Sequence, residues 1–202
     1  MLDLVLFVSG ASLILGTRTS FVVVAYVVLA ALTTAFVAPS AEHAPLPLVL
    51  FVLSGALKLI VAPIGVLLFL RANPLAENLR PSIALPGRIL LVIGFALAAR
   101  GASHLPALGT IANSHIVSYA ILCGIGMLIV HRNLLAHLLG LLVLGTGVTL
   151  AGAILVPTLP ESVELGATFD ALIATFIGLA LVRAVIAHNP LLDVESLRRL
   201  RG

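Results

Sequence analysis

Lys58 is the residue of this chain whose chemistry most needs an explanation. It lies in the middle of an apolar run, 47–70, that contains no other charge and is long enough to cross a bilayer. An ammonium group near the bilayer midplane costs roughly 3 kcal/mol to insert, so it usually faces protein, a water-filled cavity or a counter-charge. Such a group could serve in proton or ion movement. Pro63 is expected to loosen the helix beside it, although proline is also common in membrane helices without a functional role.

The carboxylate of Asp170 is the second candidate for chemistry inside the membrane. It lies about two turns into the last apolar segment, whereas Glu161 and Glu164 lie at the outer boundary of that segment. Three roles are open for the carboxylate of Asp170. It forms a hydrogen bond between packed helices, it binds and releases a proton, or it is the counter-charge for Lys58 or for a lysine of a partner subunit. Arg183, near the other end of the segment, can extend its guanidinium to the membrane surface.

Two histidines, His115 and His137, lie inside apolar segments. Each makes an interhelical hydrogen bond, which is the commoner use of such a residue, or relays a proton. Metal binding is not expected, because His131 and His137 face different sides of a helix and Cys123 is the only cysteine. The sequence also contains no nucleotide-binding loop, catalytic triad or carboxylate dyad. We therefore expect no catalytic residue and no cofactor or metal in this chain.

The overall composition indicates that membrane helices carry the candidate residues named above. The chain has 202 residues, of which 61% are hydrophobic and 9% charged, so it is predicted to be an all-α integral membrane protein. The net charge of +3 is spread thinly and does not indicate nucleic-acid binding. The first segment has no basic residue before its apolar run and carries Asp3, which indicates a retained helix rather than a cleaved signal peptide.

Charged and proline-rich breaks divide the chain into about seven predicted membrane helices. A count of six, with the first two runs misjudged, is the main alternative. The longest loop, 71–84, is too short to fold alone. The predicted helices are 2–17, 20–38, 47–70, 85–99, 107–130, 134–156 and 165–187.

The arginines support this count, because seven crossings place eight of them on one side and only Arg100 on the other. The positive-inside rule then predicts a cytoplasmic C-terminus and an N-terminus outside. The tail 188–202 is expected to form an amphipathic segment that lies on the cytoplasmic face or against a partner. The alternative is that its arginines only determine the membrane topology. The eight are Arg18, Arg71, Arg80, Arg88, Arg132, Arg198, Arg199 and Arg201.

The sixth predicted helix is rich in small residues. Gly147 and Ala151 lie four residues apart, which is the spacing that permits close approach of a neighbouring membrane helix.

Several segments resemble one known family of membrane subunits. The sequences HRNLLAHLLGLLVL (131–144), IGLAL (177–181) and LLDVESLRRLRG (191–202) resemble the K subunit of respiratory complex I. A fuller resemblance, over most of the chain, is to component E of hydrogenase-four, a subunit of a formate-hydrogenlyase-type membrane complex. GALKLIVAPI (55–64) and ESVELGATFDALIA (161–174) are similar to its segments. The resemblance divides the chain into an N-terminal extension, 1–130, and a K-like part, 131–202.

The resemblance implies a non-catalytic subunit in the membrane arm of a complex-I-like assembly, such as a group 4 nickel-iron hydrogenase of the bacterial inner membrane. Its expected partners are antiporter-like and quinone-chamber-like membrane subunits, together with peripheral hydrogenase or iron–sulfur subunits. Lys58, Glu164 and Asp170 match component E positions. The intramembrane glutamates of the related subunits are replaced, because this chain has Leu142, Gly145 and Ala174 at those positions.

Three functions follow as alternatives. The first is a membrane subunit that contributes to assembly and to proton or ion translocation coupled to electron transfer, with Lys58, Asp170, His115, His137 and Glu164 as candidates for the proton path. The second is a subunit of a multi-subunit cation/proton antiporter, which the additional N-terminal helices disfavour. The third is a purely structural membrane anchor.

Overall fold

The computed structural model describes residues 2–37, 55–79, 81–104, 114–155 and 161–188, and every element in these residues is helical. The all-α prediction is confirmed for this part of the chain. A π-helical turn, η1, precedes α4, and a short 3-10 turn, η2, follows it. The elements are α1 (Leu2–Leu15), α2 (Thr19–Val37), η1 (Leu57–Val61), α4 (Ala62–Ala72), η2 (Pro74–Glu77), α5 (Leu85–Ala102), α6 (Ser114–Val130), α7 (Leu134–Leu155) and α8 (Glu161–His188).

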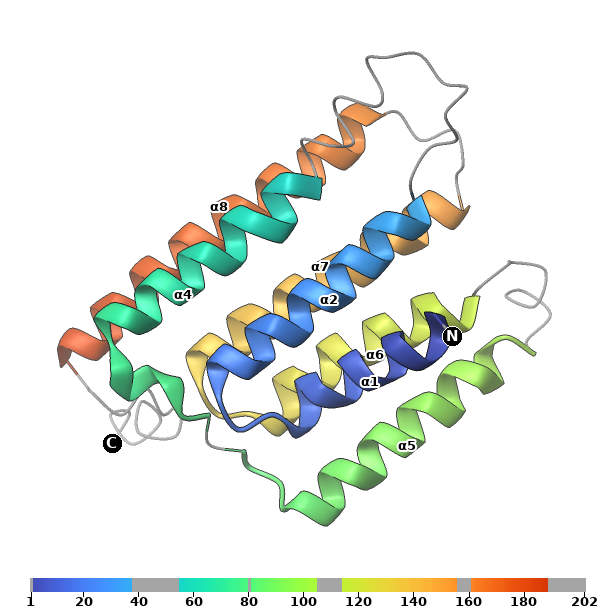
Figure 1. The fold of residues 1–202 in the computed structure, drawn as a ribbon, viewed down its shortest axis with the longest axis horizontal. Coiled ribbons are helices and arrows are strands. Elements are labelled where there is room, and N and C mark those ends of the chain that lie inside the picture. Colours follow the sequence, from blue (N-terminus) through green and yellow to red (C-terminus); the bar gives the residue numbers. More distant parts are fainter. Residues whose placement is uncertain (1, 38–54, 80, 105–113, 156–160, 189–202) are drawn as a thin grey trace, which may run out of the picture.

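The long helices form two stacked rows (Figure 1). The first row contains α1, α2 and α4, and the second contains α6, α7 and α8. Each helix of the first row contacts one helix of the second, so that α1 packs on α6, α2 on α7 and α4 on α8. The two helices of each pair run in the same direction (Figure 1). The remaining long helix, α5, packs on α1 and α6 at one edge of the rows.

The helix ends differ from the predicted ends by a few residues, for local reasons. α1 ends at Leu15 rather than at 17, immediately before Gly16, a residue that commonly follows the last turn of a helix. α8 begins at Glu161 rather than at 165, so Glu161 and Glu164 belong to its first turn. Acidic residues stabilise this end of a helix, because it carries a partial positive charge. The predicted helix 47–70 is described only from Gly55 onward.

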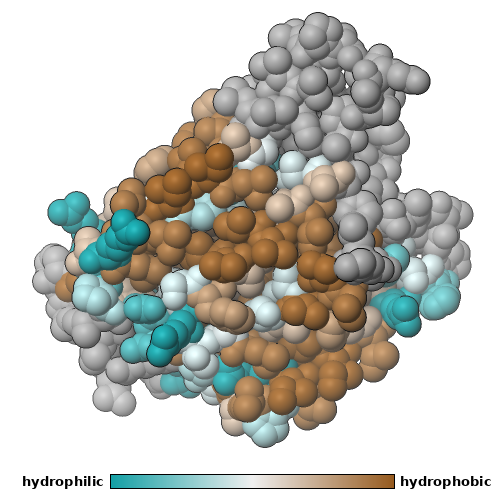
Figure 2. Space-filling model, in the orientation of Figure 1, coloured by the Kyte–Doolittle hydropathy of each residue, from teal (hydrophilic) through white to brown (hydrophobic). Residues whose placement is uncertain are grey.

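The face shown in Figure 2 is mostly apolar, and its hydrophilic residues lie mainly toward the left and right of the view. Three described helices are long and apolar enough to cross a membrane, namely Leu85–Ala102, Leu134–Gly152 and Thr168–Ile186. The shorter helices α1, α2 and α6 are also apolar. Because water is absent from the bilayer core, backbone groups there must be satisfied within helices, as they are here. The number of crossings stays a prediction.

Small residues bring α6 and α7 into close contact. A Cβ atom added to Gly124 of α6 would lie 2.7 Å from the backbone nitrogen of Leu144, and one added to Gly147 would lie 3.0 Å from the backbone nitrogen of Ile121. Both glycines therefore face the backbone of the other helix, which has no room to move aside. The predicted close approach at Gly147 is confirmed, and it gives the bundle its tightest helix pair.

Gly147→Leu should consequently separate α6 from α7 and destabilise the protein by more than the roughly 1–3 kcal/mol typical of overpacked cores. Thermal unfolding of the purified protein in detergent measures this loss. Gly145→Leu is the matched control, because Gly145 lies on the same helix, is exposed and has no atom within 4 Å of a built Cβ. Equal melting temperatures for the two variants would contradict the close contact.

Candidate functional site

Lys58 lies within the π-helical turn η1, in which each backbone bond spans five residues instead of four. The amide of Ala62 donates to the carbonyl of Leu57, which closes this wider turn. Pro63 explains the distortion, because it has no amide hydrogen and its ring would collide with the carbonyl four residues earlier. The expected loosening of the helix beside Lys58 is thus seen as a π turn, a feature that often marks functional positions in helices. Lys58 is half-buried.

The level of Lys58 in the bundle follows from the packing of η1 and α4 on α8. A Cβ atom added to Gly65 would lie 3.6 Å from Leu179, so these two residues share a level. Since α4 and α8 are parallel, Lys58 lies near the level of Leu172, two residues from Asp170. Asp170 is nine residues from Leu179, which places it on the opposite side of α8, and it is exposed. Asp170 therefore faces away from the helix that carries Lys58.

The other candidates for the proton path are dispersed. His115 lies in the first turn of α6 and His137 in the first turn of α7, and these turns are at opposite ends of the bundle because the two helices are antiparallel. His137 donates from Nδ1 to the carbonyl of Asn133, at 2.9 Å. Glu164 lies in the first turn of α8. Among the described residues, no three His, Cys, Asp or Glu side chains gather as a metal site.

Several hydroxyl groups inside the helices are satisfied locally. Thr33 and Thr34 both donate to the carbonyl of Ala30, at 2.9 and 2.7 Å, and Thr146 donates to the carbonyl of Leu142 at 2.9 Å. Each bond stays within one helix turn. These intrahelical bonds lower the cost of burying the three hydroxyl groups.

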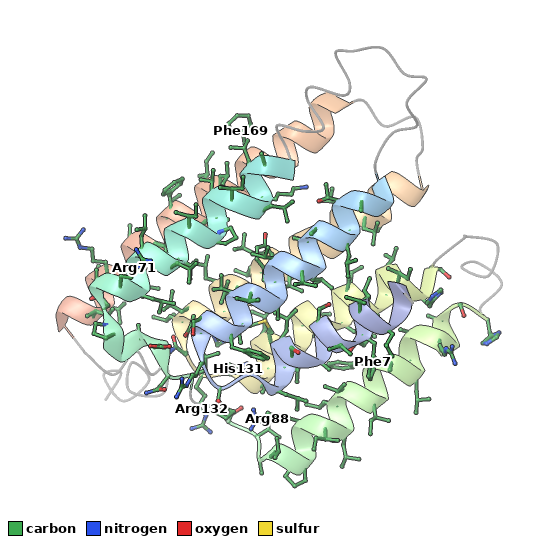
Figure 3. All side chains as sticks on the ribbon, viewed as in Figure 1. Phe7, Arg71, Arg88, His131, Arg132 and Phe169 are labelled. Atoms are coloured by element: carbon green, nitrogen blue, oxygen red, sulfur yellow. The ribbon has the colours of Figure 1, made fainter. Side chains whose placement is uncertain are left out.

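A polar cluster that the sequence did not reveal lies at the end of the bundle where α1 ends. Arg88 of α5 is only 5% exposed, and its Nη1 donates to the carbonyl of Leu15 at 2.9 Å. His131, between α6 and α7, is 1% exposed, and its Nε2 donates to the carbonyl of Gly16 at 3.1 Å. The last carbonyls of a helix have no intrahelical partner and carry partial negative charge. Arg88 and His131 satisfy them in α1 (Figure 3).

Two buried atoms of this cluster have no hydrogen-bond partner within the described residues, namely Nε of Arg88 and Nδ1 of His131. They are complementary, because the first is a donor and the second is an acceptor in a neutral imidazole that carries its hydrogen on Nε2. Burial holds the pKa of His131 below its ordinary value, with a smaller contribution from the positive charge of Arg88, against the opposing effect of the hydrogen bond to the carbonyl of Gly16. His131 is therefore neutral in the folded protein at pH 7.

The segments that join the helices bind to the same end. The amide of Ser82 donates to the carbonyl of Val130 at 2.7 Å, and the amide of Leu79 donates to the carbonyl of Thr17 at 2.9 Å. Ser20, in the first turn of α2, donates to Oε1 of Glu77 at 3.1 Å. Residues 73–79, 81 and 82 are thus held against both rows of helices. Arg71, Arg88 and Arg132 all lie at this end (Figure 3).

Comparison with known proteins identifies the second row of helices. Residues 113–202 match the family model of NADH-ubiquinone/plastoquinone oxidoreductase chain 4L. The match covers α6, α7 and α8, whereas α1, α2, α4 and α5 lie outside it. No curated protein and no solved structure shows significant similarity to the chain. The match supports the resemblance of this part of the chain to the K-type subunit of complex I, and together with the apolar helices it indicates a membrane protein.

The positions where the related subunits carry intramembrane glutamates are now placed in the bundle. Leu142 is buried in the core, whereas Gly145 of α7 and Ala174 of α8 are exposed. None of the three has a group that can bind a proton. A carboxylate is nevertheless present one turn from Ala174, at Asp170, and the histidines of this row lie near the helix ends.

The neutral state of His131 predicts a pH dependence of stability. Since its pKa is lowered in the folded protein, the unfolded chain binds more protons as the pH falls through about 6.5, and the folded state then loses stability. Above that pH the contribution is fully present. The melting temperature of the purified protein should fall between pH 7.5 and 5.5, and His131→Gln should weaken this dependence. His104→Gln, on an exposed histidine near the end of α5, is the control. An unchanged dependence in His131→Gln would refute the assignment.

Proposed function

We propose that this chain is a non-catalytic, multi-pass subunit in the membrane arm of a complex-I-like oxidoreductase of the hydrogenase-four type, in a bacterial inner membrane. The match of residues 113–202 to the chain 4L family carries this proposal. The first row of helices, packed along the matched row, supports the resemblance to component E, which has such an N-terminal extension. Electron carriers and catalytic metals would then belong to partner subunits, and this chain would hold none.

We further propose that the chain crosses the membrane about seven times, with its C-terminus in the cytoplasm. The grouping of Arg71, Arg88 and Arg132 at one end supports this orientation, because positive residues concentrate on the cytoplasmic side. Arg100 lies at the other end, in the last turn of α5.

Reporter fusions test the orientation. A reporter joined at Gly202 should indicate the cytoplasm, and one inserted after Glu42 should indicate the opposite side. An additional fusion after Asn73, in the segment that binds the arginine-rich end, should agree with the fusion at Gly202. A fully reversed pattern would overturn the orientation, and any other pattern would require a different number of crossings.

Lys58 is the first candidate for a role in proton or ion translocation, and Asp170, His115, His137 and Glu164 remain candidates for the same path. Its position in a π turn supports this role, because a distorted backbone leaves polar groups that water or a neighbouring side chain must satisfy.

Lys58→Met should preserve assembly of the complex and lower coupled ion movement several-fold, because it keeps the apolar stem and removes the charge. Proton or sodium uptake by reconstituted vesicles, measured with redox turnover, separates coupling from activity. Ile60→Met, in the same π turn and 53% exposed, is the matched control, and Lys58→Arg retains a cation. If Lys58→Met leaves turnover and ion uptake intact, the chain is a structural anchor.

An antiporter subunit remains the second candidate, because complexes of that class also contain a K-like subunit. Neighbouring genes for nickel-iron and iron–sulfur subunits favour the oxidoreductase, whereas antiporter genes alone favour the alternative. Purification of the complex through a tag on this chain distinguishes the two directly by the redox subunits that are recovered.

A further inference from the structure

The outer face of α8 is the surface of the bundle on which we expect another subunit to pack. The candidate span of α7 is 56% buried inside the chain, whereas the spans of α5 and α8 are 17% and 24% buried. α7 is thus central, and α5 and α8 flank the bundle. α8 contacts α7, α4 and η1 on one side only, which leaves the rest of its surface uncovered by the described chain.

These two flanking helices differ in what they expose. Between Arg88 and Arg100, α5 carries only apolar residues, and its exposed face is therefore compatible with lipid. The described exposed face of α8 is also apolar except for Arg183 near its end and a carboxylate, Asp170, nearer the start of the helix. Its exposed large side chains are Phe169, Ile173, Phe176, Ile177 and Leu181.

Asp170 lies too deep for its carboxylate to belong to the membrane surface. Arg183, also exposed, is thirteen residues further along α8. At 1.5 Å per residue this separation is about 20 Å, roughly two thirds of the ~30 Å hydrocarbon layer. With Arg183 near the inner surface, Asp170 remains about 10 Å inside the outer boundary. A carboxylate at such a depth costs free energy unless another group pairs with it.

The residues around Asp170 leave room for another backbone. Gly166 and Ala174 lie four residues before and after it, on the same face of the helix, and both are exposed. A Cβ atom built on Gly166 meets nothing within 4 Å. Small residues with this spacing allow membrane helices to approach closely, so that short polar side chains can pair between them.

We propose that the face of α8 around Asp170 docks a transmembrane helix of a different subunit, and that this helix brings a lysine or arginine to the carboxylate. The identity of that subunit as part of a complex-I-like assembly rests on the proposed function, whereas the docking face and its chemistry do not. Pairing across this contact neutralises a charge that lipid would leave unpaired. The carboxylate therefore favours a helix with a basic residue over a helix without one.

Charge distinguishes this occupant from the alternatives. A second copy of the chain, docked symmetrically through the same face, would bring Asp170 close to its own counterpart, and two carboxylates repel each other. Acyl chains would surround the carboxylate without a hydrogen-bond donor or a counter-charge. Only a helix with a basic side chain at this depth satisfies both the apolar face and the carboxylate.

Photo-crosslinking in the native membrane identifies the occupant. Ile177, which is 56% exposed and lies seven residues from Asp170 on the same face, is replaced by the photoreactive residue p-benzoylphenylalanine. The control carries the same residue in place of Leu90, which is 69% exposed on α5. After irradiation of the intact complex, mass spectrometry of the products should show an adduct from α8 to a membrane helix that contains lysine or arginine within its apolar span. The control at Leu90 should give lipid adducts.

Charge exchange then tests the pairing. Asp170→Lys should lower the amount of that subunit recovered with the chain at least about tenfold, because like charges then meet. Asp170→Glu should retain it. Replacing the partner's basic residue by aspartate in the Asp170→Lys background should restore recovery. Adducts to a second copy or to lipid alone, a partner helix without a basic residue, or full recovery with Asp170→Lys would each overturn the proposal.

The outcomes also separate this inference from the proposed function. A crosslinked and charge-paired partner outside the complex-I-like class would uphold the docking face and refute the proposed assembly. Recovery of complex-I-like subunits together with lipid-only crosslinks from position 177 would uphold the assembly and refute the docking face.

Discussion

The arrangement of the helices depends on how the C-terminal carbonyls of α1 are satisfied. Helix ends leave carbonyls without partners, and at this end they are buried beneath α5 and the turn between α6 and α7. Arg88 and His131 donate to the carbonyls of Leu15 and Gly16, so one side chain from each neighbouring element is tied to α1. Removing either would leave a buried carbonyl unsatisfied, at a cost of about 1–3 kcal/mol. The two rows are thereby fixed relative to each other at the arginine-rich end.

The sequence predicted the helices well, because long apolar runs between charged or proline-rich breaks determine where a membrane helix forms. It did not predict which helices lie side by side. The helices are apolar on all sides, so no stripe of hydrophobic residues marks the buried face. Only glycine gave a lateral signal, and the spacing at Gly147 correctly indicated a close contact. The stacking of α1 on α6, α2 on α7 and α4 on α8 depends on shape complementarity that residue types do not encode individually.

The candidate site was predictable to a similar extent. Lys58 stood out because a single charge in an apolar run is costly, and Pro63 indicated the distortion that appears as a π turn. Arg88 was interpreted only as a determinant of topology, and His131 was considered only as a metal ligand. Their burial depends on where α1 ends in space, which requires the tertiary structure. A signal was nevertheless present, since Arg88 lies one turn inside an apolar helix, where a surface arginine is not expected.

The two-row architecture bears on how a 4L-like unit is used. The matched helices α6, α7 and α8 form one row, and one face of that row is covered by α1, α2 and α4 of the same chain. A covered face needs no partner subunit for its stability. Contacts with other membrane subunits are then left to the opposite face and to the flanks, α5 and α8. Since α5 exposes only apolar residues between Arg88 and Arg100, and α8 exposes Asp170, the chain distinguishes a lipid flank from a protein flank by the placement of one carboxylate.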